Sequence, residues 1–359
     1  YKIMQKVLHI IPRLGNGGAE KLLLSTAPHY LKHNLKIKII CLTSESQICD
    51  ELRSRSIDVL CMHGKGRMYD LLTVKNLLKT IKNEKPDIVI SHLLMANFFA
   101  FISCFLTFKK HIPVIHNLNT EYSIKDKFLN FLIKIFSYRI ICVSNAVKTF
   151  EDINQPSFVK SKTRVLYNAI DISFFEKNTC VREHIKKETD FNLLCSCRIV
   201  SQKRHKDLLY AFSESKYLQK AKLTILGDGP LLDDIKELSK SLNVYDRCIF
   251  TGHVDDVAIY LDKADIFVYP SEREGNPLAL IEALARGLPV ILSDIDCHKE
   301  LFPEKDIFFK TKDVSSLTKK IDNFCKDNLD YFNKNKIIKA DLDKFNPKNY
   351  VKNFLTSIE

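Results

Sequence analysis

The stretch DIFVYPSEREGNPLALIEALARGLPVILSD, residues 265–294, predicts a strand, a loop, a helix and a second strand. Residues 266–269 form a short apolar run of the buried-strand type, and Pro277 suits the first position of a helix because its missing N–H would have no partner there. Gly287 ends this helix. A helix that begins directly after a Gly-Asn segment presents free N–H groups and the positive end of its dipole. The stretch therefore predicts the capture of a phosphate or another anion.

Two glutamates flank the start of this helix: Glu274 comes just before it and Glu282 lies about two turns inside. Paired glutamates at a helix end are most often solvated charges. Here the surrounding sequence is apolar and rich in Ala and Leu, which argues against solvation. We expect Glu274 to lie at the mouth of a site with the phosphates, and Glu282 to lie deeper, where it could hold a sugar hydroxyl.

The segment EGNPLALIEALARGLPV resembles the E-x7-E signature of retaining nucleotide-sugar glycosyltransferases of family 4, which have the GT-B fold. The preceding strand, the Gly, the Pro, the second Glu and the Gly-x-Pro-Val all fall at the spacing of that family. The resemblance implies that Glu274 contacts the donor sugar as a catalytic residue and that Glu282 binds the ribose. It also implies a binding site for the donor diphosphate at Asn276, Pro277 and Leu278.

The composition is typical of a soluble globular protein, and 359 residues suit two domains that each bury a core. The 11 cysteines are scattered, mostly within apolar runs, and no Cys-x2-Cys pair occurs. This pattern indicates reduced, packed thiols in a cytoplasmic protein, and neither a disulfide framework nor a zinc site. No signal peptide is expected before the first strand.

The formal net charge of +12 belongs wholly to the first half of the chain. Residues 1–170 contain 25 Lys and Arg against 12 Asp and Glu, whereas the rest contains 30 against 31. Such an excess suits an anionic membrane surface, a lipid-pyrophosphate acceptor or a nucleic acid. Nucleic acid is disfavoured because the basic residues are not interleaved with aromatic ones.

A glycine-rich turn at residues 15–18 separates an expected strand, residues 6–11, from an expected helix. Glycines let backbone N–H groups approach an anion closely. The turn lacks the Gly-x-Gly-x-x-Gly spacing of dinucleotide-binding folds. It resembles the Gly-Gly-Ala-Glu loop of family 4, which implies that Gly17 and Gly18 lie near the donor diphosphate and that Arg13 lies on the acceptor side.

His116 and Asn117 follow an expected strand at residues 113–115. The carboxyl ends of strands are where sites collect in open α/β sheets, although a single histidine is more often structural. The family resemblance implies that His116 faces the donor sugar as a second catalytic residue and that Asn117 lies on the acceptor side.

Two helices with apolar surfaces are expected on either side of His116 in the sequence. Residues 93–108 are too short for a membrane span, so we expect a buried or interfacial helix. Residues 125–138 form an amphipathic helix with Lys125, Lys127, Lys134 and Arg139 around its apolar side. Attachment to a membrane surface and ordinary core packing explain this pattern equally well.

Arg198 and Lys203 follow an expected strand at residues 192–196. A guanidinium and an ammonium at this spacing can clamp a diphosphate, and a solvated basic loop is the alternative. The two residues resemble the Arg-x4-Lys donor-phosphate motif of family 4. Cys197 and Arg204 stand where the family usually has glycine, which puts the shape of the loop in question more than the two charges.

Two further turns resemble the nucleotide pocket of the family. GDGP at residues 227–230 resembles its Gly-x-Gly-Pro turn, and residues 252–254 stand where it usually places the nucleobase against backbone groups. The resemblance implies a nucleobase region made of Gly227, Asp228, Gly252, His253 and Val254.

The alternation of strands and helices predicts an α/β protein with parallel sheets covered on both faces. The resemblance implies the GT-B fold: two Rossmann-like parallel-sheet domains facing a cleft, with a C-terminal helix that crosses back to the N-terminal domain. We expect an acceptor-binding domain at residues 1–170, a donor-binding domain at residues 171–340, and the returning helix at residues 341–359.

By resemblance, the protein is a retaining glycosyltransferase that moves a hexose or an N-acetylhexosamine from a nucleotide sugar, preferably a UDP-sugar, without a cofactor or a metal. Its acceptor would be a hydroxyl of a glycan or of a lipid-pyrophosphate-linked sugar, in cell-surface polysaccharide synthesis. The departing diphosphate would be stabilised by Arg198, Lys203 and the helix start. Two alternatives are a GDP-mannose-dependent mannosyltransferase and an inactive nucleotide-sugar-binding paralogue that acts as a partner subunit.

The expected location is the cytoplasm, peripherally at the inner face of the cell membrane, with the basic N-terminal domain on the anionic lipid and no nucleic acid bound. We also expect Glu274→Ala and Lys203→Ala to abolish transfer while leaving the fold intact.

Overall fold

The computed structural model describes residues 6–15, 17–67, 70–118, 123–153, 155–176, 191–302, 306–326 and 342–358. The chain divides into two compact units, Tyr1–Ile170 with Lys344–Glu359, and Asp171–Asp343. Within the described ranges, every helix is too short or too polar to cross a membrane.

The first unit is built on a seven-stranded parallel sheet in the order β3-β2-β1-β4-β5-β6-β7. The chain order reverses between β1 and β4, which creates the switch point where open α/β sheets place their ligands. The strands are β1 Lys6–Ile11, β2 Lys36–Cys41, β3 Asp58–Cys61, β4 Ile88–His92, β5 Lys110–Ile115, β6 Ile140–Cys142 and β7 Thr163–Val165.

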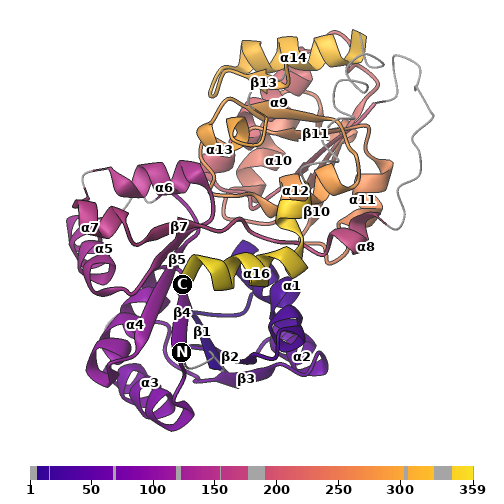
Figure 1. Cartoon of the computed structure of the whole chain (residues 1–359). Helices are drawn as coiled ribbons and strands as arrows, with labels where there is room; N and C mark the ends of the chain where they lie inside the picture. Colours follow the sequence, from indigo (N-terminus) through magenta and orange to yellow (C-terminus); the bar gives the residue numbers. More distant parts are fainter. Residues whose placement is uncertain are drawn as a thin grey trace. The chain divides into compact units, whose positions relative to one another are not determined.

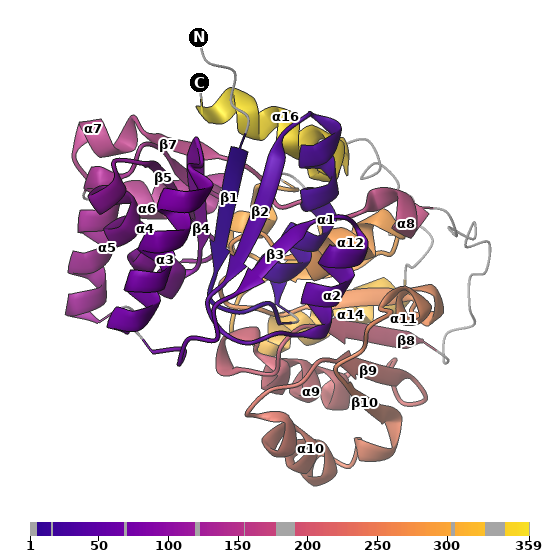
Figure 2. The same cartoon turned by 90° about the horizontal axis from the view of Figure 1, so that it is seen from below.

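Helices cover both faces of this sheet, with α1 and α2 on one side and α3, α4 and α5 on the other (Figure 2). Val7 and Ile11 of β1 pack on the first side, whereas Leu8 and Ile10 pack on the second. Burial on both faces is what makes strands of a parallel sheet almost continuously apolar. The helices are α1 Gly18–Lys32, α2 Gln47–Ser54, α3 Leu71–Glu84, α4 Leu94–Thr107, α5 Ile124–Phe136, α6 Asn145–Asp152 and α7 Ser157–Lys160.

The last helix, α16 (Pro347–Ile358), packs beside α1 (Figure 1). Phe354 of α16 is buried with its ring centroid 5.8 Å from that of Tyr30 in α1, and Val351 is completely buried. The C-terminal helix therefore contributes to the core of the first unit.

The second unit is built on a six-stranded parallel sheet in the order β10-β9-β8-β11-β12-β13, which reverses between β8 and β11. Helices α9, α10 and α14 share one core with this sheet, and α8 packs against α12. The strands are β8 Asn192–Ser196, β9 Lys222–Leu226, β10 Cys248–Gly252, β11 Ile266–Tyr269, β12 Val290–Ser293 and β13 Phe308–Phe309. The helices are α8 Ile172–Glu176, α9 His205–Glu214, α10 Leu232–Ser241, α11 Ala258–Lys263, α12 Leu278–Ala285, α13 Asp296–Lys299 and α14 Val314–Lys326. Both units are thus Rossmann-like, as the sequence predicts.

Candidate active site

Two loops leave the second sheet at its switch point. Strands β8 and β11 are parallel neighbours, so their carboxyl ends release the loops 197–204 and 270–277 at the same edge. The N–H of Glu272 donates a hydrogen bond of 2.9 Å to the backbone oxygen of Gln202, which ties the loops together. This tie brings the predicted phosphate-binding lysine and the first predicted glutamate face to face.

Lys203 and Glu274 form an ion pair in which the side chains are only 13% and 8% exposed. Lys203 Nζ also donates a hydrogen bond of 3.2 Å to Tyr269 Oη at the end of β11. Burial by itself lowers the pKa of Lys203, but the charge of Glu274 and the hydrogen bond that Lys203 donates to Glu274 outweigh burial, so the pKa lies above its usual value. The site thus keeps a buried ammonium at neutral pH, next to a tyrosine that the sequence analysis did not identify.

Arg198 lies on the same loop as Lys203 but is exposed. Its backbone is held on both sides, because the N–H of Cys197 donates to Leu226 O at 3.0 Å and the N–H of Ile199 donates to Asp228 O at 2.9 Å. Its guanidinium makes no ion pair with any residue in the described ranges. The loop therefore combines one paired, buried cation with one cation open to an incoming anion.

Arg204 explains why a glycine suits the position after Lys203. Its φ of 55° lies in the left-handed region, between the short turn Ser201–Lys203 and helix α9. This conformation costs a non-glycine residue about 1–2 kcal/mol. The Arg204 guanidinium offsets part of that cost with two hydrogen bonds of 2.9 Å to the Asp207 carboxylate. Cys197, the other departure from the family pattern, has no positive φ.

The helix that follows Glu274 begins one residue later than predicted. Pro277 is its N-cap, with φ −74° and ψ 113°, and Leu278 is its first residue. Glu274, Asn276 and Glu282 are each about 6% exposed, as their apolar surroundings predict for the two glutamates. The segment before α12 therefore sets a buried carboxylate beside the ammonium of Lys203, and it also contains the buried amide of Asn276.

Two of the predicted nucleobase residues, Gly227 and Asp228, lie next to the loop 197–204, and a third, Gly252, is hydrogen-bonded to Gly227. The N–H of Gly227 donates a hydrogen bond of 2.8 Å to Gly252 O, which joins the ends of β9 and β10. Gly227 has a φ of 130°, and a Cβ there would lie 2.1 Å from Cys197 O. Asp228 contributes the backbone oxygen that holds Ile199. His253 and Val254 follow Gly252 directly, and the His253 side chain is 41% exposed.

In the first unit, His116 is the end of a chain of three histidines. His9 Nδ1 lies 3.0 Å from His92 Nε2, and His92 Nδ1 lies 2.9 Å from His116 Nε2. Burial lowers the pKa of His9 to about 3 and that of His116 to about 4, and it holds the pKa of His92 well below its usual value. All three imidazoles are therefore neutral at pH 7. His9 and His92 come from β1 and β4, the two strands at the switch point.

The hydrogen bonds favour one order of protons along this chain. His9 Nε2 is buried without a partner. A bare nitrogen is tolerated there better than an N–H that donates to nothing. We therefore assign the protons so that His9 donates to His92, His92 donates to His116, and His116 carries its own proton on Nδ1. In this order, His116 presents a hydrogen-bond donor.

In the first unit, the glycine-rich loop at residues 15–18 lies against the side-chain carboxylate of Glu20. Gly17 is the N-cap of α1 and Gly18 its first residue, and both are exposed. The Glu20 side chain is buried beside Gly17, where a Cβ would lie 2.5 Å from Glu20 Oε2, and it accepts hydrogen bonds from the backbone of Gly15 and of Glu20. Burial raises the pKa of Glu20. A diphosphate bound at Gly17 would therefore have to displace Glu20.

Two predicted acceptor-side residues lie in the same unit. Arg13 is exposed and its charge acts on Glu20. Asn117 is half-buried, and its Oδ1 accepts a hydrogen bond of 2.8 Å from the N–H of Leu118.

Comparison with known proteins decides the family. The sequence profile described as Glycosyltransferase Family 4 matches residues 16–174, and the profile described as Glycosyl transferases group 1 matches residues 176–341. The chain belongs to glycosyltransferase family 4. The two profiles together span nearly the whole chain, and they include the glycine-rich turn at Gly17 and Gly18 and the segment from Glu274 to Glu282.

Bacterial relatives of family 4 show moderate identity. The chain is 29% identical over 252 residues to the alpha-monoglucosyldiacylglycerol synthase of Streptococcus pneumoniae, an alignment that covers 63% of this chain and 56% of that protein. It is 28% identical over 316 residues to the UDP-Gal:alpha-D-GlcNAc-diphosphoundecaprenol alpha-1,3-galactosyltransferase of Escherichia coli, which covers 81% of this chain and 80% of the relative.

A solved structure shows the same fold. The Anabaena protein HepE, crystallised with UDP and glucose, has a TM-score of 0.83 and 17% identity, over 98% of this chain and 100% of that chain. The predicted GT-B fold with two Rossmann-like domains is thereby confirmed.

Proposed function

We propose that the protein is a retaining glycosyltransferase that uses a UDP-sugar to glycosylate a hydroxyl of a glycan or of a lipid-linked acceptor in surface-glycan synthesis. The observation that carries the proposal is the arrangement of Arg198, Lys203 and Glu274 on the neighbouring loops 197–204 and 270–277. It supplies two cations and a carboxylate at the switch point of one sheet. The relatives support the substrate classes, since one is named for a UDP-Gal donor and a diphosphoundecaprenol acceptor.

Charge stabilisation is the main task in such a transfer. As the sugar–phosphate bond breaks, negative charge develops on the departing diphosphate. Arg198 is open to bind it, and Lys203 can share its protons between the phosphate and Glu274. The helix α12 begins four residues after Glu274, and its first N–H groups would add the positive end of a helix dipole. These groups would do the work that a divalent metal does in other transferases, so we propose that transfer needs no metal.

In the second unit, Glu274 would act on the donor sugar. The Glu274 carboxylate can accept hydrogen bonds from hydroxyls of the donor sugar and stabilise positive charge at its anomeric carbon. His116, which carries its proton on Nδ1, would donate a hydrogen bond to a sugar oxygen. Glu282 would bind the ribose, and the turns at Gly227 and Gly252 would border the nucleobase.

A surface formed by α4 and α5 suits an anionic membrane. Ile124 and Phe128 of α5 are 87% and 63% exposed, and Lys125 and Lys127 are exposed beside them. Lys134 was also expected on this basic surface, but it is buried in an ion pair with Glu151. The neighbouring exposed residues, which complete what we call the α4–α5 face, are Phe105, Leu106, Phe108 and Phe136. We propose that apolar insertion and the two lysines hold this face on lipid, near a lipid-linked acceptor.

The donor is tested by incubating the protein with UDP-glucose, UDP-galactose, UDP-N-acetylglucosamine or GDP-mannose, with or without added Mg²⁺, and measuring nucleotide release. We expect UDP release that Mg²⁺ does not increase, and NMR should show the anomeric configuration of the donor in the product. Release from GDP-mannose alone, a requirement for Mg²⁺, or an inverted product would each contradict the corresponding part of the proposal. Tight UDP binding without turnover would indicate an inactive paralogue.

The membrane contact is tested by sedimentation with vesicles of phosphatidylglycerol or of phosphatidylcholine. We expect binding to the anionic vesicles, and we expect a double substitution, Ile124→Ser with Phe128→Ser, to weaken it. Ile259→Ser is the matched control, because Ile259 is 50% exposed in the second unit. Equal binding by the unsubstituted protein, the double variant and the control would show that the α4–α5 face does not bind the membrane.

A further inference from the structure

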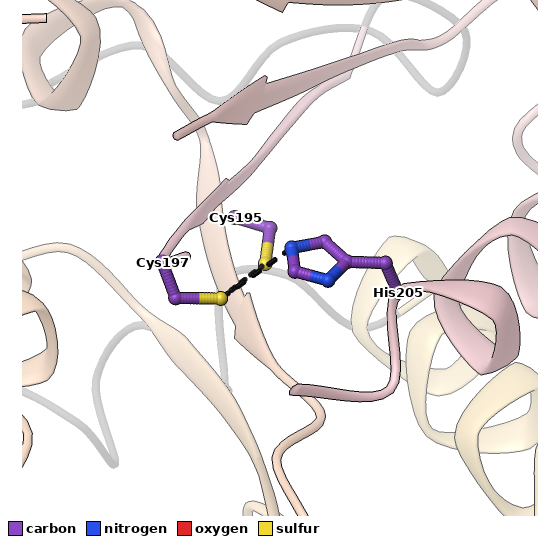
Figure 3. Close-up of side chains that lie close together, drawn as sticks. All are labelled: Cys195, Cys197 and His205. Carbon is purple, nitrogen blue, oxygen red and sulfur yellow. Dashed lines mark hydrogen bonds between the residues drawn. The ribbon is translucent and has the colours of Figure 1, made fainter. Parts of the chain in front are cut away.

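Two thiols and an imidazole lie close together where the loop 197–204 joins strand β8 and helix α9 (Figure 3). Cys195 and Cys197 are two residues apart at the end of β8, so their side chains project to the same side. His205 is the first residue of α9. Cys197 Sγ lies 3.9 Å from Cys195 Sγ and 3.4 Å from His205 Nε2, and the three atoms all lie within 4.8 Å of one another. We call these residues the Cys195–Cys197–His205 cluster.

The spacing of this cluster is that of a tetrahedral metal site. Zn²⁺ binds thiolate sulfur at about 2.3 Å and imidazole nitrogen at about 2.0–2.1 Å. Tetrahedral angles then place two sulfurs roughly 3.8 Å apart, and a sulfur and a nitrogen roughly 3.6 Å apart. The two distances in the cluster agree with these values. The site is also sheltered, since Cys195 is fully buried and His205 is 2% exposed.

Although the scattered cysteines of the sequence predict no zinc site, we propose that Cys195, Cys197 and His205 bind a soft transition-metal ion, with Zn²⁺ as the reference case. On binding, the two thiols would release their protons and the two thiolates would neutralise the divalent charge, so no net charge would be buried. The three side chains leave a fourth tetrahedral position for water. This ion would differ from the Mg²⁺ or Mn²⁺ that other transferases place on the diphosphate, because soft sulfur ligands select against those ions.

The position of the cluster indicates what the ion would do. Cys197 directly precedes Arg198, and His205 comes two residues after Lys203. A metal bound by Cys197 and His205 would link the two ends of the segment 197–205. This segment carries Arg198 and Lys203, the two residues predicted to bind the diphosphate. The ion would therefore order this loop before any nucleotide arrives. This role does not depend on the proposed sugar transfer.

A second group serves as an internal control. Glu45, Cys49 and Cys61 also lie close together, and their two sulfurs are 3.5 Å apart. Arg53 already holds the Glu45 carboxylate with two hydrogen bonds of 2.8 Å. A carboxylate engaged in this way is a poor metal ligand, so we expect no metal at this group.

The test is a titration of the reduced full-length protein with Cd²⁺ and with Zn²⁺, following thiolate-to-cadmium ultraviolet absorption and equilibrium dialysis. We expect one bound ion per chain. Cys197→Ser and His205→Gln should each weaken binding by about 100-fold or more, since even loss of an outer partner of a ligand commonly costs 10- to 100-fold. Cys49→Ser and Cys248→Ser should bind as the unsubstituted protein does.

Absence of binding, or equal binding by Cys197→Ser, would overturn the proposal, as would a loss confined to Cys49→Ser. Because a substitution at buried His205 could unfold the second unit, X-ray absorption of the unsubstituted protein loaded with zinc provides an independent measurement. The expected first shell contains two sulfur atoms and at least one imidazole nitrogen. A shell without two sulfurs would contradict the assignment.

Discussion

Lys203 and Glu274 form a buried ion pair between two loops that leave the neighbouring strands β8 and β11. The residues are far apart in the sequence, and the parallel pairing of these strands makes them adjacent. The pair has both a structural and a proposed catalytic role, so substitutions at either residue must be judged by folding as well as by activity.

Breaking this pair should destabilise the second unit, contrary to the expectation from sequence that folding would stay intact. Lys203→Met or Glu274→Gln leaves one charge buried without its partner, which costs about 3–5 kcal/mol. The double variant should regain much of that free energy of unfolding. Urea unfolding measures all three. The matched control is Lys240→Met, since Lys240 pairs with Glu237 at the surface and should change stability by less than about 1 kcal/mol. Single variants as stable as the unsubstituted protein would show that the pair is not buried.

Gly227 and Gly252 offer a comparison of backbone strain and steric contact. Both have positive φ and they are joined by one hydrogen bond, but a Cβ at Gly227 would lie 2.1 Å from Cys197 O, whereas a Cβ at Gly252 meets nothing within 4 Å. Gly252→Ala should therefore lose only about 1–2 kcal/mol of unfolding free energy. Gly227→Ala should lose clearly more, because the loop 197–204 has to move. Thermal unfolding measures both losses of stability. Equal losses in the two variants would contradict the close approach of Gly227 to the backbone oxygen of Cys197.

Acid should destabilise the first unit through its buried histidines. Burial lowers the pKa of His9 to about 3, so below pH 6.5 the unfolded chain binds a proton that the folded chain does not. Stability is therefore complete above about pH 6.5 and falls as the pH falls towards 3, by up to about 1.4 kcal/mol per pH unit for this residue. The loss between pH 7 and pH 5 should be smaller in His9→Phe by roughly 2 kcal/mol. His33→Asn, at an exposed position, should keep the full loss. An unchanged loss in His9→Phe would exclude a neutral, buried His9.

His92 should act as a positioning residue for His116. Without the hydrogen bond of 2.9 Å, the ring of His116 is free to change its tautomer and its orientation. Replacing His92 by Phe should lower kcat for sugar release by about 10- to 100-fold, with a smaller change in KM. A merely structural role would instead lower the amount of folded protein without changing kcat per folded molecule. His33→Asn is again the control for activity.

The sequence predicts both sheets, and it indicates Arg198, Lys203 and Glu274 as candidate site residues because they stand in short motifs directly after strands. It could not predict the partner of Lys203, since contact between loops after β8 and β11 depends on which strands are neighbours. The sequence also could not predict the contact between His9 and His92, because it depends on the pairing of strands β1 and β4. Glu20 and Lys134 show the opposite case: their local patterns predict an open anion site and a basic face, but tertiary packing buries both side chains.

Arg198 provides the most direct test of the central claim, that the second unit binds a nucleoside diphosphate at the switch point of its sheet. Its side chain is exposed and makes no ion pair within the described ranges, so Arg198→Ala should not change the unfolding temperature. Lys206→Ala is the control, because Lys206 is exposed on the adjoining first turn of α9. The decisive measurement is calorimetric titration of these proteins with UDP. We predict that Arg198→Ala weakens binding by at least about tenfold while Lys206→Ala does not, as expected for the loss of a charge-assisted hydrogen bond. Equal affinity of Arg198→Ala and the unsubstituted protein would contradict the account.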